Sequence, residues 1–167
     1  MSDPGSEART PINVFYDVDH TLVFVSHEVN ALRPRAHESM QRLKAAGHGV
    51  YVWSAGGKDY VERIVDMHGL RPWVDGCFDK DPKVQPRPDF IIDDDWYLVE
   101  KYGGHCVSQY KAVDDSDSEL ITALESLAHV AIRRPPELKH MPAHDFRTSY
   151  GPYLEARAGE AHALGAD

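Results

Sequence analysis

Two aspartates stand two positions apart at the end of an apolar run, in the stretch NVFYDVDHTLVF that covers residues 13–24. A turn with two solvated acids would show the same residue types. However, Asp17 and Asp19 follow a β-branched and aromatic segment that is typical of a buried strand. Carboxylates can bind a cation, attack an electrophile or transfer a proton. The pair therefore predicts a reactive site in which Asp17 attacks and Asp19 moves the proton.

Polar side chains also stand directly after three later apolar runs of the chain. They are Ser54, Lys80 and the acidic triplet Asp93, Asp94 and Asp95. If the strands are parallel, their carboxyl ends meet at one edge of a sheet, so these groups and the first two aspartates converge there. Five carboxylates cannot all stay ionised without a cation, and hard oxygen ligands favour Mg²⁺. The sequence therefore predicts a Mg²⁺ site, with Ser54 and Lys80 as donors to a phosphate.

The elements that would position these side chains alternate between strands and helices. Pro34 is predicted as the first residue of an amphipathic helix that ends at Gly47. Ser116 and Glu119 match a capping box before another helix. Continuous apolar strands that alternate with helices predict an α/β fold, a Rossmann-like three-layer sandwich with a five-stranded, mainly parallel sheet. The expected strands cover residues 12–16, 49–53, 76–78, 89–92 and 105–110.

Composition indicates one globular domain that does not bind nucleic acid. The 167 residues include 27 acidic and 18 basic side chains, and the resulting charge of −9 leaves no broad basic face for a phosphate backbone. Cys77 and Cys106 are too few for a disulfide scaffold and favour a reduced, cytoplasmic setting. The polar N-terminus does not match a signal peptide, and no stretch is apolar enough to span a membrane.

Three of these segments, taken together, resemble the signature motifs of the haloacid-dehalogenase-like (HAD) superfamily. VFYDVDHTLV resembles the first motif, VYVWSAG resembles the strand that ends in Ser or Thr, and DFIIDDD resembles the strand that ends in paired acids. The resemblance implies a phosphatase with a Rossmannoid fold that works through an aspartyl-phosphate intermediate. It also implies that Asp17 is the nucleophile, that Asp19 is the general acid and base, and that Ser54 binds phosphate.

The same resemblance implies which residues hold Mg²⁺. They are Asp17, the carbonyl of Asp19 and one of the two acids Asp93 and Asp94, of which we expect Asp94 to bind the metal directly. Taken alone, the acidic triplet would equally suit a helix N-terminus, where acids stabilise the first turn by about 0.3 to 1 kcal/mol. The combination with Asp17 is what favours a metal site.

Two positions of the motif pattern stay open. The motif lysine is either Lys80 or Lys83, and we favour Lys80 because it follows a predicted strand directly. His20 stands between Asp19 and Thr21, where many superfamily members have glycine or another small residue. Thr21 is expected to hydrogen-bond the backbone of its own loop rather than a substrate.

The spacing of the motifs leaves no room for a cap domain. About 33 residues separate Thr21 from Ser54, and about ten separate Lys83 from Asp93, which is less than a domain of ordinary size needs. A capless site is open. The resemblance therefore points to a phosphoprotein substrate, or to a small phosphate ester whose site a second copy of the chain closes.

We expect three segments in the chain: a flexible N-terminus at residues 1–11, a catalytic domain at 12–134 and a partly irregular C-terminal extension at 135–167. The alternative to an enzyme is a non-catalytic module that binds metal or phosphate, or accepts a phosphoryl group as receiver domains do. In a receiver domain, the phosphate-accepting Asp precedes the Ser or Thr and the lysine. Here Ser54 precedes the lysine and the acidic triplet comes last, which favours the phosphatase.

Overall fold

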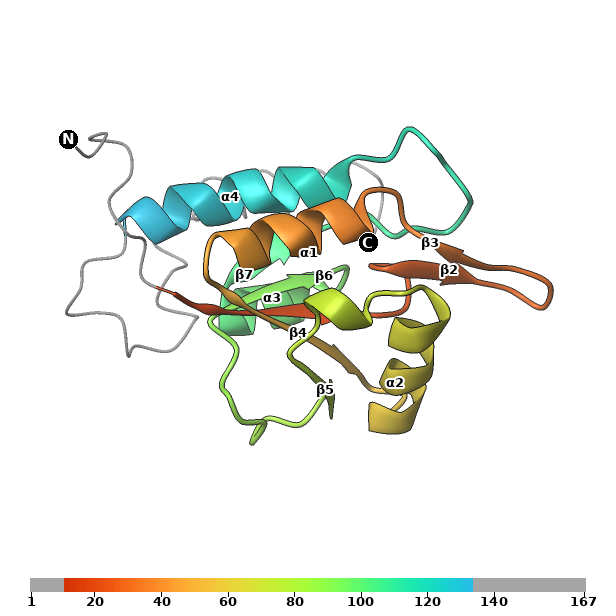
Figure 1. The fold of residues 1–167 in the computed structure, drawn as a ribbon, viewed down its shortest axis with the longest axis horizontal. Coiled ribbons are helices and arrows are strands. Elements are labelled where there is room, and N and C mark those ends of the chain that lie inside the picture. Colours follow the sequence, from red (N-terminus) through yellow and green to blue (C-terminus); the bar gives the residue numbers. More distant parts are fainter. Residues whose placement is uncertain (1–10, 134–167) are drawn as a thin grey trace.

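A five-stranded parallel sheet forms the centre of the protein (Figure 1). The computed structural model describes the backbone of residues 11–133 and the side chains of residues 11–127. The strands of the sheet are β1 (Asn13–Asp17), β4 (Gly49–Ser54), β5 (Gly76–Asp79), β6 (Phe90–Asp93) and β7 (Gly104–Cys106). Their order is β5-β4-β1-β6-β7, and all four neighbouring pairs are parallel. The predicted parallel sheet is confirmed.

Helices cover both faces of this sheet. They are α1 (Ala36–Ala45), α2 (Lys58–Met67), the short 3₁₀ helix η1 (Arg71–Trp73), α3 (Trp96–Tyr102) and α4 (Glu119–Arg133). Tyr16 of β1 hydrogen-bonds Ser39 of α1 at 2.8 Å, and α4 lies beside α1 (Figure 1). The preceding residue, Phe15, points to the opposite face and packs on Trp53, which contacts Tyr102 of α3. The result is the predicted three-layer, Rossmann-like α/β sandwich.

The register of the sheet brings the ends of three strands to one level. Asp17, the last residue of β1, pairs with Trp53 of β4, so Ser54 lies one residue beyond that pair. On the other side of β1, the paired part of β6 stops one position earlier, which places Asp93 at the level of Asp17. The chain crosses from β5 to β6 over β4 and β1, so the strand order reverses at β1. Ligand sites of open α/β sheets lie at such a reversal.

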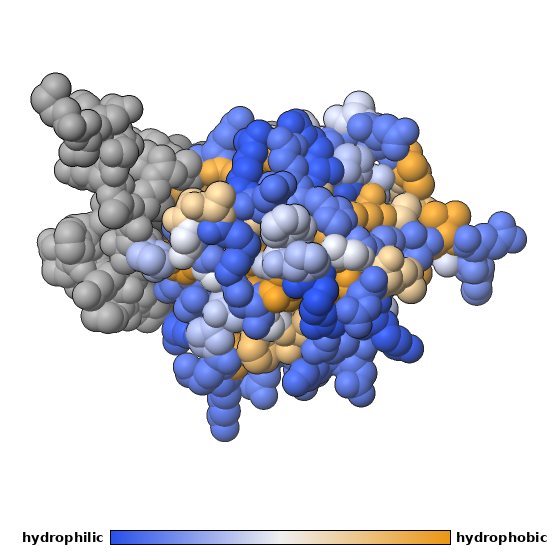
Figure 2. All heavy atoms as spheres, viewed as in Figure 1, coloured by the Kyte–Doolittle hydropathy of each residue, from blue (hydrophilic) through white to orange (hydrophobic). Residues whose placement is uncertain are grey.

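A small antiparallel hairpin, formed by β2 (Val23–Val25) and β3 (Asn30–Leu32), extends from the sheet directly after β1 (Figure 1). Figure 2 shows apolar spheres at this end of the molecule, and the hairpin residues Val25 and Val29 are exposed. The sequence predicted only a loop here. Each strand has three residues, which is too short for an apolar alternation to stand out.

Two predicted helix starts are wrong in detail. Pro34 is not the first helical residue: α1 begins at Ala36, because the residue between them takes a left-handed conformation with φ of 68°. At α4 the predicted capping box does not form. Asp117, not Ser116, accepts the hydrogen bond from the backbone N–H of Glu119 at 3.1 Å. The side chain that accepts a hydrogen bond from the first residue of α4 is therefore an aspartate, where the sequence pattern predicted a serine.

The last strand of the sheet is shorter than predicted. β7 ends at Cys106, although residues 105–110 were expected to be extended throughout. The predicted flexible N-terminus lies outside the described residues except for Pro11, and the predicted C-terminal extension lies outside them entirely. Within the described part of the chain, no helix combines the length and apolar character that crossing a membrane requires.

Candidate active site

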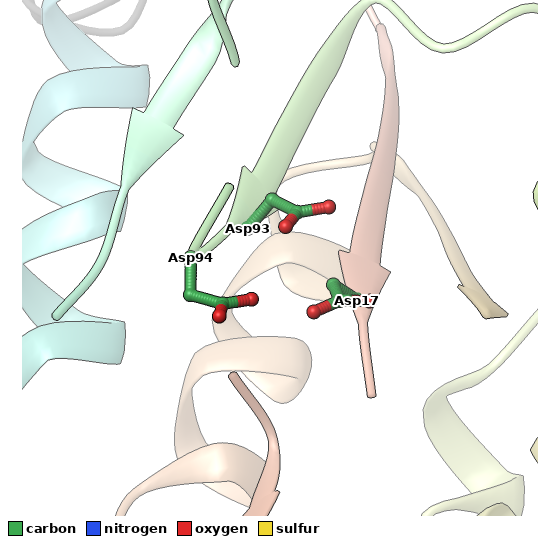
Figure 3. A group of neighbouring side chains, drawn as sticks. All are labelled: Asp17, Asp93 and Asp94. Atoms are coloured by element: carbon green, nitrogen blue, oxygen red, sulfur yellow. The ribbon is translucent and has the colours of Figure 1, made fainter. Parts of the chain in front are cut away.

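Three carboxylates meet at the carboxyl ends of β1 and β6 (Figure 3), and one ammonium group lies against them. Oxygens of Asp17, Asp93 and Asp94 lie within 4.8 Å of one another, and the carboxylates of Asp17 and Asp94 point toward each other. Nζ of Lys80 lies 2.8 Å from Asp17 Oδ1 and 2.9 Å from Asp93 Oδ2. Asp17 and Asp93 are buried. The cluster thus carries more negative than positive charge, which a bound cation would balance.

Burial is the main cause of the raised pKa values of two carboxyl groups in this cluster. Burial and then repulsion from Asp93 raise the pKa of Asp17 to about 8, although Lys80 acts in the opposite direction. Burial likewise raises the pKa of Asp93 to about 6, against the effect of Lys80. Burial opposes the charge of Lys80, but the two carboxylates raise its pKa. Without a cation, Asp17 therefore favours its protonated form at neutral pH.

Asp94 is oriented by two side chains that the sequence did not connect to it. Thr21 Oγ1 donates to Asp94 Oδ1 at 3.3 Å, and Gln109 Nε2 donates to Asp94 Oδ2 at 3.0 Å. Burial acts to raise the pKa of Asp94, but hydrogen bonds from Asp17, Gln109 and Thr21 lower it below its usual value. Thr21 also lies 3.1 Å from Asp17 Oδ2. The expectation that its hydroxyl bonds the backbone is therefore wrong, since both of its partners are carboxylates.

The acidic triplet divides into two parts with different surroundings. Asp93 and Asp94 belong to the carboxylate cluster. Asp95 is the N-cap of α3, and its carboxylate accepts a hydrogen bond from the backbone N–H of Tyr97 at 3.0 Å. The helix-start interpretation is thus confirmed for Asp95, and the metal-site interpretation stays a prediction for Asp93 and Asp94.

Lys80, rather than Lys83, reaches the carboxylates. β5 ends at Asp79, and the backbone N–H of Lys80 donates to the carbonyl of Ser54 at 3.1 Å, so the lysine begins at the same sheet edge as the acids. The side chain of Lys83 is exposed. Ser54 is buried at the end of β4, and its Oγ accepts a hydrogen bond from the backbone N–H of Gly56 at 3.0 Å.

Asp19 is exposed in the loop after β1 and is not one of the three clustered carboxylates. Its Oδ1 accepts a hydrogen bond of 2.6 Å from the hydroxyl of Tyr60, in the first turn of α2. Burial, together with the charge of Asp19, raises the pKa of Tyr60 above its ordinary value, so the hydroxyl keeps its proton at neutral pH. No sequence pattern indicates this contact, because the two residues are 41 positions apart and share no element.

The loop that carries Asp19 is held by a buried arginine. The guanidinium of Arg33 forms two hydrogen bonds with the carboxylate of Asp117, with Nε–Oδ1 and Nη2–Oδ2 distances of 2.8 and 3.0 Å. Its Nη1 donates to the carbonyls of Thr21 at 3.3 Å and His20 at 3.5 Å. Only 1% of the arginine is exposed. Because a buried guanidinium needs partners, this loop has one favourable position.

His20 occupies the left-handed turn of the same loop, with φ of 64°. Its backbone N–H donates to the carbonyl of Val23 and its carbonyl accepts from the backbone N–H of Tyr110, both at 2.8 Å. Its Nδ1 is buried and, among the described residues, has no hydrogen-bond partner. A glycine would adopt this turn without strain. The backbone of His20 shapes the loop, and its ring makes no hydrogen bond to the carboxylates.

A search against models of known protein families and a search of curated proteins both find no match. The resemblance of three motifs to the HAD superfamily therefore stays a prediction. The carboxylate cluster, with Lys80 against it and Asp19 in the neighbouring loop, is the feature of the structure that bears on function.

Proposed function

We propose that the protein is a Mg²⁺-dependent phosphatase, a phosphomonoester hydrolase that forms an aspartyl-phosphate on Asp17. The observation that supports this most is the buried Asp17 at the end of β1, with Lys80 at 2.8 Å and two further carboxylates beside it. A phosphoryl group brings several negative charges, so a site that binds it needs cationic partners. Lys80 is one such partner, and the acids can hold the other.

The donor set of the cluster fits Mg²⁺. Asp17, Asp93 and Asp94 offer only oxygen atoms, and these atoms lie close enough to share one ion. Mg²⁺ is usually held by one or two carboxylates together with waters and phosphate oxygens. We propose Asp17, the carbonyl of Asp19 and one or both of the other two acids as its ligands. When bound, Mg²⁺ would offset charge on the phosphoryl oxygens and keep Asp17 ionised.

The side chains of the site then share the work of two steps. In the first step, a carboxylate oxygen of Asp17 attacks phosphorus, the bond from phosphorus to the leaving oxygen breaks, and that oxygen takes the proton of the Asp19 carboxyl. In the second step, Asp19 accepts a proton from water, the water oxygen attacks phosphorus, and the bond to Asp17 breaks. Ser54 and Lys80 bind the phosphoryl oxygens in both steps.

The surroundings of the site support an accessible substrate. Between β1 and β4 the chain forms the short hairpin and α1, and residues 80–89 between β5 and β6 form neither helix nor strand. We therefore propose a phosphoprotein or a small phosphate ester as the substrate, with a second copy of the chain covering the site in the second case. We also propose a cytoplasmic location, because the two cysteines of the sequence, Cys77 and Cys106, are too few for a disulfide scaffold.

Hydrolysis of an aryl phosphate, measured with Mg²⁺ and with EDTA, tests this proposal. We expect turnover only with Mg²⁺, and none in Asp17→Asn, because an amide cannot act as the nucleophile. Asp115→Asn, which changes an exposed acid, serves as the control and should retain full activity. Full activity in Asp17→Asn would refute the nucleophile. Absence of turnover by the unaltered protein, with Mg²⁺ bound, would favour the non-catalytic module.

A further inference from the structure

We propose that Tyr60 is a positioning residue, which holds the carboxylate of Asp19 in the orientation that proton transfer requires. This inference rests on the proposed phosphatase function. The hydroxyl of Tyr60 donates a hydrogen bond of 2.6 Å to Oδ1 of Asp19. Among the described side chains, no other forms a hydrogen bond with this carboxylate.

The carboxylate of Asp19 needs such a partner because the rest of its surroundings leave it free to rotate. Arg33 fixes the backbone of the loop through the carbonyls of His20 and Thr21, but it does not bond the side chain of Asp19. An exposed carboxylate samples several orientations, whereas an acid catalyst must lie within hydrogen-bond reach of the leaving oxygen. With Oδ1 bound to Tyr60, Oδ2 is the oxygen left to carry the proton.

Tyr60 is itself held in place by the start of α2. The ring packs so closely on Gly56 that a Cβ at this glycine would lie 3.0 Å from Cδ1 of Tyr60. On α2, the guanidinium of Arg63 lies 5.9 Å from the centre of the ring. The backbone N–H of Gly56 also donates to Ser54 Oγ. Gly56 therefore contacts both Ser54, the proposed phosphate-binding residue, and Tyr60. This turn connects the part of the site that would bind phosphate with the part that would transfer the proton.

Proton donation to the leaving oxygen matters far more for some esters than for others. An alkoxide is a strong base and must be protonated as it leaves, whereas 4-nitrophenolate is a weak base and leaves without help. The ratio kcat/KM reports the steps up to the first irreversible one, here formation of the aspartyl-phosphate. Comparing glycerol 2-phosphate with 4-nitrophenyl phosphate therefore isolates the proton transfer by Asp19.

The decisive variant is Tyr60→Phe, which keeps the ring and removes the hydroxyl. We expect kcat/KM for glycerol 2-phosphate to fall by about 10-fold or more, and that for 4-nitrophenyl phosphate to change by less than about 2-fold. Tyr51→Phe is the control: it removes a hydroxyl from β4, three positions before Ser54. It should leave kcat/KM for both esters unchanged. An equal loss on the two esters in Tyr60→Phe, or no loss on either, would overturn the proposal.

A second comparison separates positioning from a general structural effect. In an Asp19→Asn background, the hydroxyl of Tyr60 no longer has a proton donor to orient, so adding Tyr60→Phe should reduce kcat/KM for glycerol 2-phosphate by less than about 2-fold. If Tyr60→Phe lowers kcat/KM as much in the Asp19→Asn background as in the unaltered protein, Tyr60 acts on a group other than Asp19 and the proposal fails. If the unaltered protein hydrolyses neither ester, the proposed function fails and this inference with it. If the unaltered protein is active but the Tyr60→Phe variants do not behave as expected, only the positioning role of Tyr60 is refuted.

Discussion

At the scale of single residues, Lys80 supplies the positive charge that lies against the carboxylate cluster. Its ammonium group contacts two buried carboxylates at 2.8 and 2.9 Å, and its own side chain is only 15% exposed. Removing one partner of a buried ion pair is more costly than the pair is stabilising, because the remaining charge keeps its desolvation cost and loses its compensation. We therefore expect Lys80 to matter for folding as well as for the phosphate binding proposed above.

We expect Lys80→Met to lower the free energy of unfolding of the metal-free protein by about 3 kcal/mol at pH 9. The loss should be smaller at pH 5, where Asp17 and Asp93, whose pKa values are raised to about 8 and about 6, hold protons in the folded state. Urea denaturation in EDTA at the two pH values measures both. Lys83→Met, at an exposed position near in sequence, is the control and should have little effect. Equal losses in the two lysine variants would contradict this role of Lys80.

At the scale of elements, the junction between β6 and α3 concentrates two functions in three consecutive acids. Asp93 ends the strand, Asp95 caps the helix, and Asp94 lies between them with its carboxylate in the cluster. The backbone N–H of Asp95 also donates to Asp93 Oδ1 at 2.9 Å. The change from strand to helix within two residues is what directs neighbouring carboxylates to different partners.

Substitutions in this triplet should separate stability from metal binding. Asp95→Ala removes the helix cap and should lower the free energy of unfolding by about 1 kcal/mol, with the affinity for Mg²⁺ unchanged within about 2-fold. Asp94→Ala removes a proposed ligand and should weaken Mg²⁺ binding by about 10-fold or more. Urea denaturation and titration calorimetry provide the two measurements. A loss of Mg²⁺ affinity in Asp95→Ala as large as in Asp94→Ala would show that the triplet acts as one unit.

The elements also show how far sequence reasoning could reach. The parallel sheet and the polar strand ends could be predicted because β1, β4 and β6 are continuous apolar runs, which is typical of strands buried on both faces. The partners of the site acids could not. The contact of Tyr60 with Asp19 depends on where α2 crosses the sheet edge, and that of Gln109 with Asp94 on the path of the chain after β7. Neither contact can be predicted from the spacing of apolar and polar residues within a single helix or strand.

At the scale of the whole molecule, a chain of net charge −9 places three carboxylates within 4.8 Å of one another. Asp17 and Asp93 have higher pKa values in the folded state than the ordinary value of 3.8. Between about pH 4 and 8 the metal-free folded state therefore binds more protons than the unfolded chain, and its stability falls as the pH rises. A cation that binds only the folded state stabilises it, and does so more strongly as the pH rises and the carboxylates lose their protons.

Removal of Mg²⁺ should thus matter most at the upper end of this pH range. With Mg²⁺ at 100 times its dissociation constant, binding should add about 2.7 kcal/mol to the free energy of unfolding. Because protons compete with Mg²⁺ for the carboxylates, the same Mg²⁺ concentration should raise Tm over EDTA by more at pH 8 than at pH 5.5. Thermal unfolding at both pH values checks this, with Asp17→Asn as the variant that should lose most of the gain. An effect of Mg²⁺ that is independent of pH would argue against binding at these acids.

The pairing of Arg33 with Asp117 ties the loop after β1 to a residue beyond the last strand of the sheet. All of the proposed catalytic and metal-binding side chains lie between residues 17 and 94, so a fragment ending soon after β7 would contain every one of them. In such a fragment Arg33, which is 1% exposed in the described structure, would lose the carboxylate that accepts its two shortest hydrogen bonds. We therefore expect the shortest chain that folds stably to be longer than the shortest chain that contains all the proposed site residues, and shortened versions of this protein should retain Asp117.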